Sequence, residues 1–218
     1  MGSMATETLS RRERKSAEIR DRLFVKALEL FAKKGYQQTT VEDITEAADV
    51  GKGTFFNYFP SKEHLLLAFG EKQVLKLGAA LELAKTSELP MREFLARLAG
   101  EMTAAPAKNP SVLGALLMAN LSSERARELM RELQMRGLGM LSKIMEIGQE
   151  RGEIRRDMAP AELASATRQM MMGTLLLWSL YADNTLETRI EASLKVLWDG
   201  LATKEAGAGE RNEEARNV

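Results

Sequence analysis

The sequence of 218 residues predicts an all-α fold with about nine helices, and three observations support this prediction. Long stretches consist mainly of Ala, Leu, Glu, Lys, Arg and Met, which favour helices. The alternation of Val, Ile and Thr that is typical of strands is absent. The five prolines separate the helix-favouring stretches: Pro60, Pro90, Pro106, Pro110 and Pro160. We therefore expect a bundle of three helices at the N-terminus and a larger helical bundle after it.

The first helix is expected from about Ser16 to Lys34. Its apolar stripe has a spacing of four residues and consists of Ile19, Leu23, Ala27 and Phe31. Gly35 follows directly, at a position where the backbone often adopts a positive φ. Thr39 and Thr40 each precede an acidic residue by three positions, which is the capping-box pattern. A short helix is therefore expected over about residues 41–48.

A tight turn at residues 49–50 ends that helix, and a second short helix is expected from about Lys52 to Tyr58. Pro60 marks its end, because proline does not continue a helix. Ser61 can cap the long helix that follows, from about Lys62 to Lys85.

Five further helices and a tail complete the chain. Proline or a capping residue begins each helix, and Gly152 ends the third of them. The expected ranges are about 90–103, 109–120, 122–151, 160–182 and 184–202. Residues 203–218 are rich in Gly, Ala and charge, and we expect a disordered tail there.

The charge balance limits the class of protein. The chain has 31 basic and 31 acidic residues, so its formal net charge is zero. This balance excludes a protein that is polybasic throughout. It does not exclude a local basic patch, because only the surface that faces a polyanion has to be positive.

The counts of cysteine and histidine exclude several kinds of site. The chain has no cysteine and one histidine, His64, which excludes disulfides and multi-histidine metal sites and disfavours a His-based triad. The two longest stretches without charge, residues 109–123 and 169–182, are shorter than the ~20 residues of a membrane-spanning helix. No secretory signal is visible. We expect a soluble cytoplasmic protein without a metal or cofactor.

The two short helices, braced by the longer helix before them, form a candidate helix-turn-helix unit. Phe55 and Phe59 lie four residues apart and would anchor the second short helix to the core. The remaining face of that helix would be free to enter the DNA major groove. An ordinary helical hairpin with an aromatic core would show the same spacing, so both interpretations stay open at this point.

The exposed positions of the second short helix carry groups suited to DNA. Lys52 supplies a cation for phosphate or guanine, and Asn57 can bond an adenine edge. Thr54 and Tyr58 have hydroxyls for phosphate oxygens. Gly53 allows the backbone to approach the DNA closely.

Two more candidates lie at helix starts. Thr40 begins the first short helix, and Lys62 begins the long helix after the unit. Free backbone N–H groups and the helix dipole favour an anion at both positions.

Residues 39–63 read TTVEDITEAADVGKGTFFNYFPSKE and resemble the DNA-binding signature of TetR-type transcriptional regulators. The pattern of that family is TT-x-x-x-I-A-x-x-A-G-V-S-x-G-x-x-Y-x-Y-F-x-S-K-E-x-L. The upstream segment AKKGY, residues 32–36, is similar to the family's F-x-x-x-G-Y/F entry. The resemblance covers about residues 24–69.

The resemblance implies a homodimeric, ligand-responsive repressor that binds a pseudo-palindromic DNA operator. It implies a phosphate contact for Thr40, and phosphate clamps at Tyr58 and Lys62. It assigns Phe55 and Phe59 to the core. The groove-facing residues that it implies are Lys52, Gly53, Thr54, Phe56 and Asn57.

Three positions depart from the family pattern. Asp49 replaces the usual glycine of the turn and can still adopt a positive φ, though less readily. Gly51 replaces the usual capping serine. Phe56 replaces a tyrosine, which removes a hydroxyl for phosphate and leaves an apolar ring for a thymine methyl group.

Residues 1–15 are expected to form a flexible basic arm, whose first four residues, MGSM, resemble an expression scar. Residues 11–15 of this arm carry four basic residues, Arg11, Arg12, Arg14 and Lys15, against one acid, Glu13. Arg12 is the candidate DNA contact, along phosphates or in the minor groove. A solvated tail is the alternative. The DNA-binding unit then spans residues 16–60, and an effector-binding and dimerisation unit spans 61–202.

The second unit is rich in methionine, which fills irregular space and adapts to varied ligands. A hydrophobic effector of unknown identity would bind between the long helix and the later helices, although methionine as plain core is the alternative. Arg168 could orient the ligand, or face solvent or an interface. The other candidate ligand residues are Met102, Met118, Leu141 and Met172.

The last two expected helices carry more apolar surface than one bundle easily buries. Two helices from each of two chains would bury it in a four-helix interface. The candidate interface residues are Leu175, Trp178, Ile190, Leu194, Leu197, Trp198 and Leu201. A core within one chain is the alternative.

Three other classes of protein are alternatives to a DNA-binding regulator. A helical small-molecule carrier without DNA binding is the main alternative. A helical adaptor that binds only protein leaves Lys52, Asn57, Tyr58 and Lys62 unexplained. An enzyme is disfavoured, because no motif places an acid–base pair and His64 falls inside the DNA-binding signature.

Overall fold

The computed structural model of the chain describes residues 10–104, 110–181 and 185–202. These residues form helices joined by short loops, as the sequence predicts, with one isolated β-bridge between Ile154 and Ala202. The helices are α1 (Arg11–Lys34), α2 (Val41–Ala47), α3 (Lys52–Tyr58), α4 (Glu63–Thr86), α5 (Met91–Thr103), α6 (Pro110–Ser122), α7 (Glu124–Glu150), α8 (Pro160–Tyr181) and α9 (Leu186–Leu201). The disorder predicted for residues 203–218 concerns a segment outside the described residues.

Helix α1 begins five residues earlier than expected. Ser10 caps it in a capping box: the Glu13 N–H donates to the Ser10 hydroxyl at 3.2 Å, and the Ser10 N–H donates to the Glu13 carboxylate at 2.7 Å. Each bond satisfies a backbone group that the helix end leaves without a partner. The prediction of a flexible arm through Lys15 is therefore wrong for residues 11–15, which are helical.

The connections of the N-terminal bundle follow local backbone chemistry. Gly35 has a φ of 86° after α1, and Asp49 has a φ of 52° in the turn between α2 and α3, as predicted. Gly51 caps α3 without a side-chain bond, again as predicted. Ser61 does not cap α4, because its hydroxyl contacts Glu63 and His64 side chains and α4 begins at Glu63.

The core of the N-terminal bundle extends beyond the predicted boundary at residue 60. Phe31, Ile44, Phe55 and Phe59 are buried in one cluster that also contains residues of α4 and α6. Leu116 of α6 belongs to this cluster, and α6 packs against α1. The three-helix bundle therefore shares its core with the C-terminal half.

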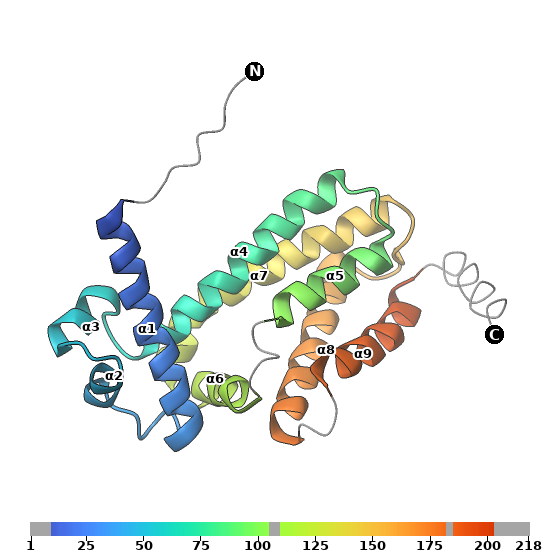
Figure 1. Ribbon diagram of the computed structural model, residues 1–218. Coiled ribbons are helices and arrows are strands. Elements are labelled where there is room, and N and C mark those ends of the chain that lie inside the picture. Colours follow the sequence, from blue (N-terminus) through green and yellow to red (C-terminus); the bar gives the residue numbers. More distant parts are fainter. Residues whose placement is uncertain (1–9, 105–109, 182–184, 203–218) are drawn as a thin grey trace.

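Helices α4 and α7 run side by side away from the N-terminal bundle, and α8 and α9 lie toward the far end of the molecule (Figure 1). Gly70 on α4 faces Met130 of α7 so closely that an added Cβ would lie 2.6 Å from the Met130 Cε. Gly78 faces Met140 further along both helices, where an added Cβ would lie 3.8 Å from the Met140 Cε, an ordinary van der Waals distance. The two helices are therefore parallel and in close contact.

Arg151 directly follows α7 and connects it to the end of α4 and to the loop before α5. Its guanidinium donates to the carbonyl oxygens of Ala84 and Ser87 at 2.6 Å and of Leu89 at 3.2 Å. These are backbone groups at the end of α4 and in the loop to α5. The half-buried guanidinium thus satisfies carbonyls that the end of α4 leaves without helical partners.

We expect an Arg151→Met variant to lose about 3 kcal/mol of the free energy of unfolding. Hydrogen bonds from a charged group contribute about 1.5–3 kcal/mol each, and methionine keeps the packing volume but none of the bonds. Urea unfolding followed by circular dichroism measures the loss. Arg136→Met, on the exposed face of α7, is the matched control and should change stability by less than about 0.5 kcal/mol. Equal losses in both variants would contradict the role of Arg151.

The apolar stripes of α8 and α9 face the interior of the chain. Trp178, Ile190, Trp198 and Leu201 are buried, so their prediction as dimer contacts is wrong. Leu175, Leu194 and Leu197 are partly buried against the two core clusters to which these four residues belong. Apolar residues that do face solvent on these two helices are Met172, Leu177, Leu180, Tyr181 and Val196.

Candidate nucleic-acid interface

Helix α3 presents one polar face to solvent. Phe55 and Phe59 are buried, as predicted, and they fix the helix to the core of the N-terminal bundle. Since these rings lie four residues apart, the other residues of the helix point outward or sideways. Lys52, Gly53, Phe56 and Asn57 are exposed, and Thr54 and Tyr58 are half-buried.

Phe56 is a large apolar side chain on this otherwise polar face. Its ring is 45% exposed and packs edge-on against the buried Phe55 ring, with centroids 5.4 Å apart. The buried ring thereby orients the exposed one. An oriented apolar ring matches the shape and polarity of a thymine methyl group.

Lys52, the first residue of α3, is paired within the chain. Its ammonium forms an ion pair with the carboxylate of Glu42 on α2. The hydrogen bond from Lys52 is the main cause of the lowered pKa of Glu42. Both side chains are more than half exposed, so the pair is screened and open to exchange with a phosphate.

The hydroxyl of Thr40 is occupied by the capping box of α2. It accepts from the Asp43 N–H at 3.1 Å and donates to the Asp43 carboxylate at 2.7 Å. Lys34 binds the same carboxylate at 2.5 Å, and this bond, followed by those from Thr40, strongly lowers the pKa of Asp43. The Thr40 hydroxyl therefore holds α2 in place in this structure.

Lys62 points into the protein, against the loop between α1 and α2. Its ammonium donates to the carbonyl oxygens of Tyr36 at 2.7 Å and Thr39 at 2.9 Å, and it lies 4.2 Å from the centroid of the Tyr36 ring. Burial lowers the pKa of Lys62, although nearby Glu63 opposes this effect. Two of its three N–H donors are thus used internally, which the prediction of a phosphate clamp did not anticipate.

Tyr36 and Glu63 extend the same contact. The Tyr36 hydroxyl donates to the Glu63 carboxylate at 3.0 Å, and burial together with this carboxylate raises the pKa of Tyr36. Burial opposes ionisation of Glu63, but hydrogen bonds from Ser61, its own backbone and Tyr36 lower its pKa overall. The beginning of α4 is thus fastened to the loop before α2.

Two acidic residues lie close to the predicted interface. Glu42 and Asp43 are both in the first turn of α2, where they pair with Lys52 and Lys34. Both carboxylates therefore offset cations beside the predicted contacts Lys52 and Thr40. The basic residues near the start of α1 are all exposed: Arg11, Arg12, Arg14 and Lys15.

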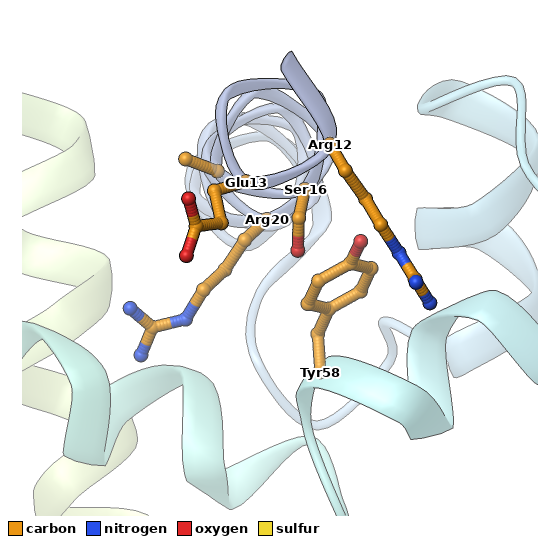
Figure 2. A pocket seen from close by; sticks show the side chains of 6 residues that line it. Arg12, Glu13, Ser16, Arg20 and Tyr58 are labelled. Carbon is orange, nitrogen blue, oxygen red and sulfur yellow. The ribbon is translucent and has the colours of Figure 1, made fainter. Parts of the chain in front are cut away.

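A cleft of about 360 Å³ lies between the first turns of α1 and the end of α3. Figure 2 shows Arg12 and Ser16 reaching from α1 toward Tyr58 of α3, with Glu13 and Arg20 on the other flank of α1. The residues that line it are Arg12, Glu13, Ser16, Ala17, Arg20 and Tyr58. Ser16 and Arg20 are lining residues that no sequence motif singled out. Arg12, Ser16 and Arg20 are spaced four residues apart, as on one face of a helix. This spacing does not stand out in the sequence, because the expected flexible arm ends at Lys15 and the expected helix begins at Ser16.

The five residues predicted for the effector site are not gathered in one pocket. Met102 and Leu141 are partly buried against the same cluster, and Arg168 is half-buried on α8. Met118 and Met172 face solvent. A groove of about 580 Å³ runs instead between α5 and α9, and its apolar lining includes Leu95, Leu194 and Trp198.

The described residues offer no candidate for a membrane span or for a metal site. No helix in the described ranges is long and apolar enough to cross a membrane. Within the same ranges, no group of three or more His, Cys, Asp or Glu side chains could hold a metal ion.

Comparison with known proteins places this geometry in context. Residues 23–69 match the model of the family described as bacterial regulatory proteins, tetR family. The HTH-type transcriptional regulator TcmR of Streptomyces glaucescens is 33% identical over 187 residues, covering 81% of this chain and 80% of that protein. The HTH-type transcriptional repressor DhaR of Mycobacterium sp. (strain GP1) is 31% identical over 166 residues, covering 72% and 81%.

A solved structure resembles the chain over most of its length. The TetR-family transcriptional repressor FadR of Thermus thermophilus, in complex with lauroyl-CoA, superposes with a TM-score of 0.63 at 27% identity. The match covers 85% of this chain and 96% of that protein. The similarity therefore includes both the N-terminal bundle and the C-terminal helices.

Proposed function

The chain belongs to the TetR family of bacterial transcriptional regulators, and from this premise we propose that it is a homodimeric repressor that a hydrophobic effector releases from operator DNA. The observation that carries this proposal is the exposed face of α3, with Lys52, Gly53, Phe56 and Asn57 projecting from a buried aromatic anchor. That face lies within the segment that matches the family.

Helix α3 enters the major groove. Lys52 exchanges Glu42 for a DNA phosphate or a guanine edge, and Asn57 bonds an adenine edge. Gly53 and Thr54 allow close approach of the backbone, and Phe56 contacts a thymine methyl group.

Other side chains position the helix rather than read the sequence. Lys62 holds the loop before α2 through its bonds to Tyr36 and Thr39. Thr40 caps α2 through its reciprocal hydrogen bonds with Asp43 and so fixes the start of that helix. Mutation of either residue acts on DNA binding through the placement of α2 and α3.

The effector is an amphipathic molecule with a long apolar part. The lauroyl-CoA bound by the FadR relative is the first probe to test. Met102 and Leu141 lie in the cluster formed by α4, α5, α7, α8 and α9, where flexible methionine side chains yield space for an apolar chain. Arg168 on α8 supplies a cation for the polar end, whereas the solvent-facing Met118 and Met172 lie outside this cluster.

The dimer uses the solvent-facing side of α8 and α9. The hydroxyls of Thr174 and Ser193 lie 2.9 Å apart where these antiparallel helices meet. Leu177 and Val196 each follow that pair by three residues, which places both side chains on the same outer face. Val196 is 72% exposed and Leu177 49%, so a second copy can cover them with its own α8 and α9.

The chain acts by binding and carries out no reaction. It works in the cytoplasm, where bacterial DNA lies. An effector shifts the dimer toward a conformer with wrongly spaced α3 helices, and the shift is limited by its difference in affinity for the two conformers.

Selection of bound duplexes from a random DNA pool tests the function directly. We expect a pseudo-palindromic site, and Lys52→Ala and Asn57→Ala should each weaken binding to it by about tenfold or more. Lys143→Ala and Gln134→Ala, at exposed positions of α7, are matched controls and should bind as the wild type does. Unchanged affinity of both α3 variants would contradict the assignment of α3.

Titration of the DNA complex with lauroyl-CoA tests the ligand response in the same assay. Release of DNA supports the ligand-relieved repressor. Binding of lauroyl-CoA without DNA affinity even at low salt would favour a small-molecule carrier instead.

A further inference from the structure

We propose that the groove between α5 and α9 binds a single-chain amphiphile with an anionic head group. The site goes beyond the effector site proposed above, because Met102, Leu141 and Arg168 do not line this groove. It also lies far from α3, toward the opposite end of the molecule (Figure 1). A ligand in the groove is therefore separate from both the DNA and the proposed effector.

The groove runs along two antiparallel helices. α5 and α9 are in contact and point in opposite directions (Figure 1). Leu95, near the start of α5, belongs to the same buried cluster as Trp198, near the end of α9. Ala99, one turn further along α5, belongs instead to the cluster of Ile190, near the start of α9. The groove therefore has two distinct ends, one at the start of α5 and one at the start of α9.

The floor of the groove is apolar. Leu95 and Trp198 line it as buried side chains, and Leu194 lines it as a half-buried one. The α5 side contributes the small residues Ala96 and Gly100, and a Cβ added to Gly100 would meet no atom of another described segment within 4 Å. Small residues on one helix opposite large ones on the other leave a groove of about 580 Å³. This volume is within the ~300–1,000 Å³ of small-molecule sites.

Charge is distributed unevenly along the groove. Its α5 wall extends from Arg92 to Ala104, a length of about 18 Å. Arg92 lies at the start of α5, and Lys195 lies in the half of α9 that approaches the same end. Glu187 and Glu191 lie in the other half of α9. The cations attract an anionic head group to the first end and the acids repel it from the second, so the apolar chain extends along the floor toward the start of α9.

These features define the class of ligand. A long apolar floor suits one extended hydrocarbon chain, which loses no hydrogen bond when it leaves water. The guanidinium at one end suits a carboxylate or a phosphate, because it can donate two parallel hydrogen bonds to either group. Laurate is the simplest probe, since it carries one saturated chain and one carboxylate.

Trp198 can report binding directly, because it lines the groove. The chain has two tryptophans, and the other, Trp178, is buried in a different cluster. The Trp178→Phe variant therefore has its single tryptophan in the groove. We expect its fluorescence to change and to saturate when laurate is added below the critical micelle concentration. Laurate brominated next to the carboxylate should quench Trp198 more than laurate brominated at the chain terminus, because the head group lies at the end nearest Trp198.

Thermal unfolding of the wild type gives a second measurement that needs no substitution. A ligand that binds only the folded chain raises the Tm as the ligand concentration rises. We expect laurate to raise the Tm, whereas dodecyltrimethylammonium, which has the same chain length and the opposite charge, should not. An equal rise with both compounds would overturn the requirement for an anionic head group.

Arg92→Gln tests the cation that holds the head group. It should weaken laurate binding by about 3- to 10-fold and leave dodecanol binding unchanged, because dodecanol has the chain but no charge. Arg97→Gln is the matched control, since Arg97 is an exposed arginine of the same helix that does not line the groove. It should bind laurate as the wild type does. Wild-type affinity of Arg92→Gln for laurate would overturn the head-group site.

Gly100→Leu tests the path of the chain. The added side chain projects into the open space of the groove and should weaken laurate binding by about tenfold or more. The variant should fold at least as stably as the wild type, because leucine favours a helix more than glycine does. Gly139→Leu is the matched control: Gly139 is an exposed glycine of α7 whose added Cβ likewise meets no atom of another described segment within 4 Å, and it does not line the groove.

The outcomes separate this site from the proposed function. Equal weakening of laurate binding by Gly100→Leu and Gly139→Leu would overturn the groove and place laurate elsewhere in the chain. A wild type that selects a DNA site but binds no laurate would overturn the groove alone. A wild type that binds laurate in the groove but binds no DNA would overturn the proposed function and leave the groove intact.

Discussion

A Phe55→Ala variant is expected to lose about 3–5 kcal/mol of the free energy of unfolding. The side chain is fully buried, and its ring packs against Phe56 at 5.4 Å and Phe59 at 5.7 Å. Alanine leaves a cavity in the cluster that holds α1, α2, α3 and α6 together. Urea unfolding followed by circular dichroism measures the loss, and DNA binding should fall because α3 loses its anchor.

Phe56→Ala is the matched control, one residue along the same helix. Its ring is 45% exposed, so stability should fall by about 1 kcal/mol or less. The substitution should instead weaken DNA binding, at operators in which a thymine lies opposite the ring. A comparable loss of stability in both variants would contradict the assignment of the Phe55 ring to the core and of the Phe56 ring to the exposed face.

Leu177→Arg and Val196→Arg are each expected to convert the dimer into monomers and to weaken operator binding by more than about 100-fold. Both residues lie on the solvent-facing side of α8 and α9, so the arginine is tolerated in one chain but is buried without a partner in the dimer. A monomer presents one α3, whereas a pseudo-palindromic site requires two of them about 34–36 Å apart. Sedimentation velocity and DNA titration measure the two effects.

Leu83→Arg tests whether any exposed leucine has this effect. Leu83 is 55% exposed on α4, close to the value for Leu177, and it lies on neither α8 nor α9. We expect it to remain dimeric and to bind DNA as the wild type does. Dimers in the Leu177→Arg and Val196→Arg variants would place the interface elsewhere.

Most helix boundaries could be predicted because their signals are local. Prolines, capping residues and positive-φ positions such as Gly35 and Asp49 act within a few residues of the chain. The start of α1 is an exception, because the helix begins five residues before the predicted position. Its capping box is local, but the cluster of basic residues around Glu13 favours the interpretation as an arm. The division of α3 into buried and exposed residues followed from the spacing of Phe55 and Phe59.

Other features depend on residues that are distant in sequence. The carbonyl oxygens that Lys62 binds belong to residues 26 and 23 positions away in the chain. The local motif around Lys62 therefore does not indicate that its side chain points inward. Glu42 and Lys52 are ten residues apart on different helices. The stripe with Trp178 and Trp198 has the same helical spacing whether it packs within one chain or between two. Sequence periodicity therefore could not distinguish the core from the dimer interface.

The shared core of α1, α3 and α6 determines which part of the chain can be exchanged with a relative. Leu116 and Ala119 of α6 belong to the same buried cluster as Leu23 and Phe55. A chimera joined at residue 60 would set one protein's α6 against another protein's α1 and would combine surfaces that did not evolve together. A transplanted DNA-reading module therefore needs the α6 side chains that face α1, even though they lie about a quarter of the chain length away from the junction.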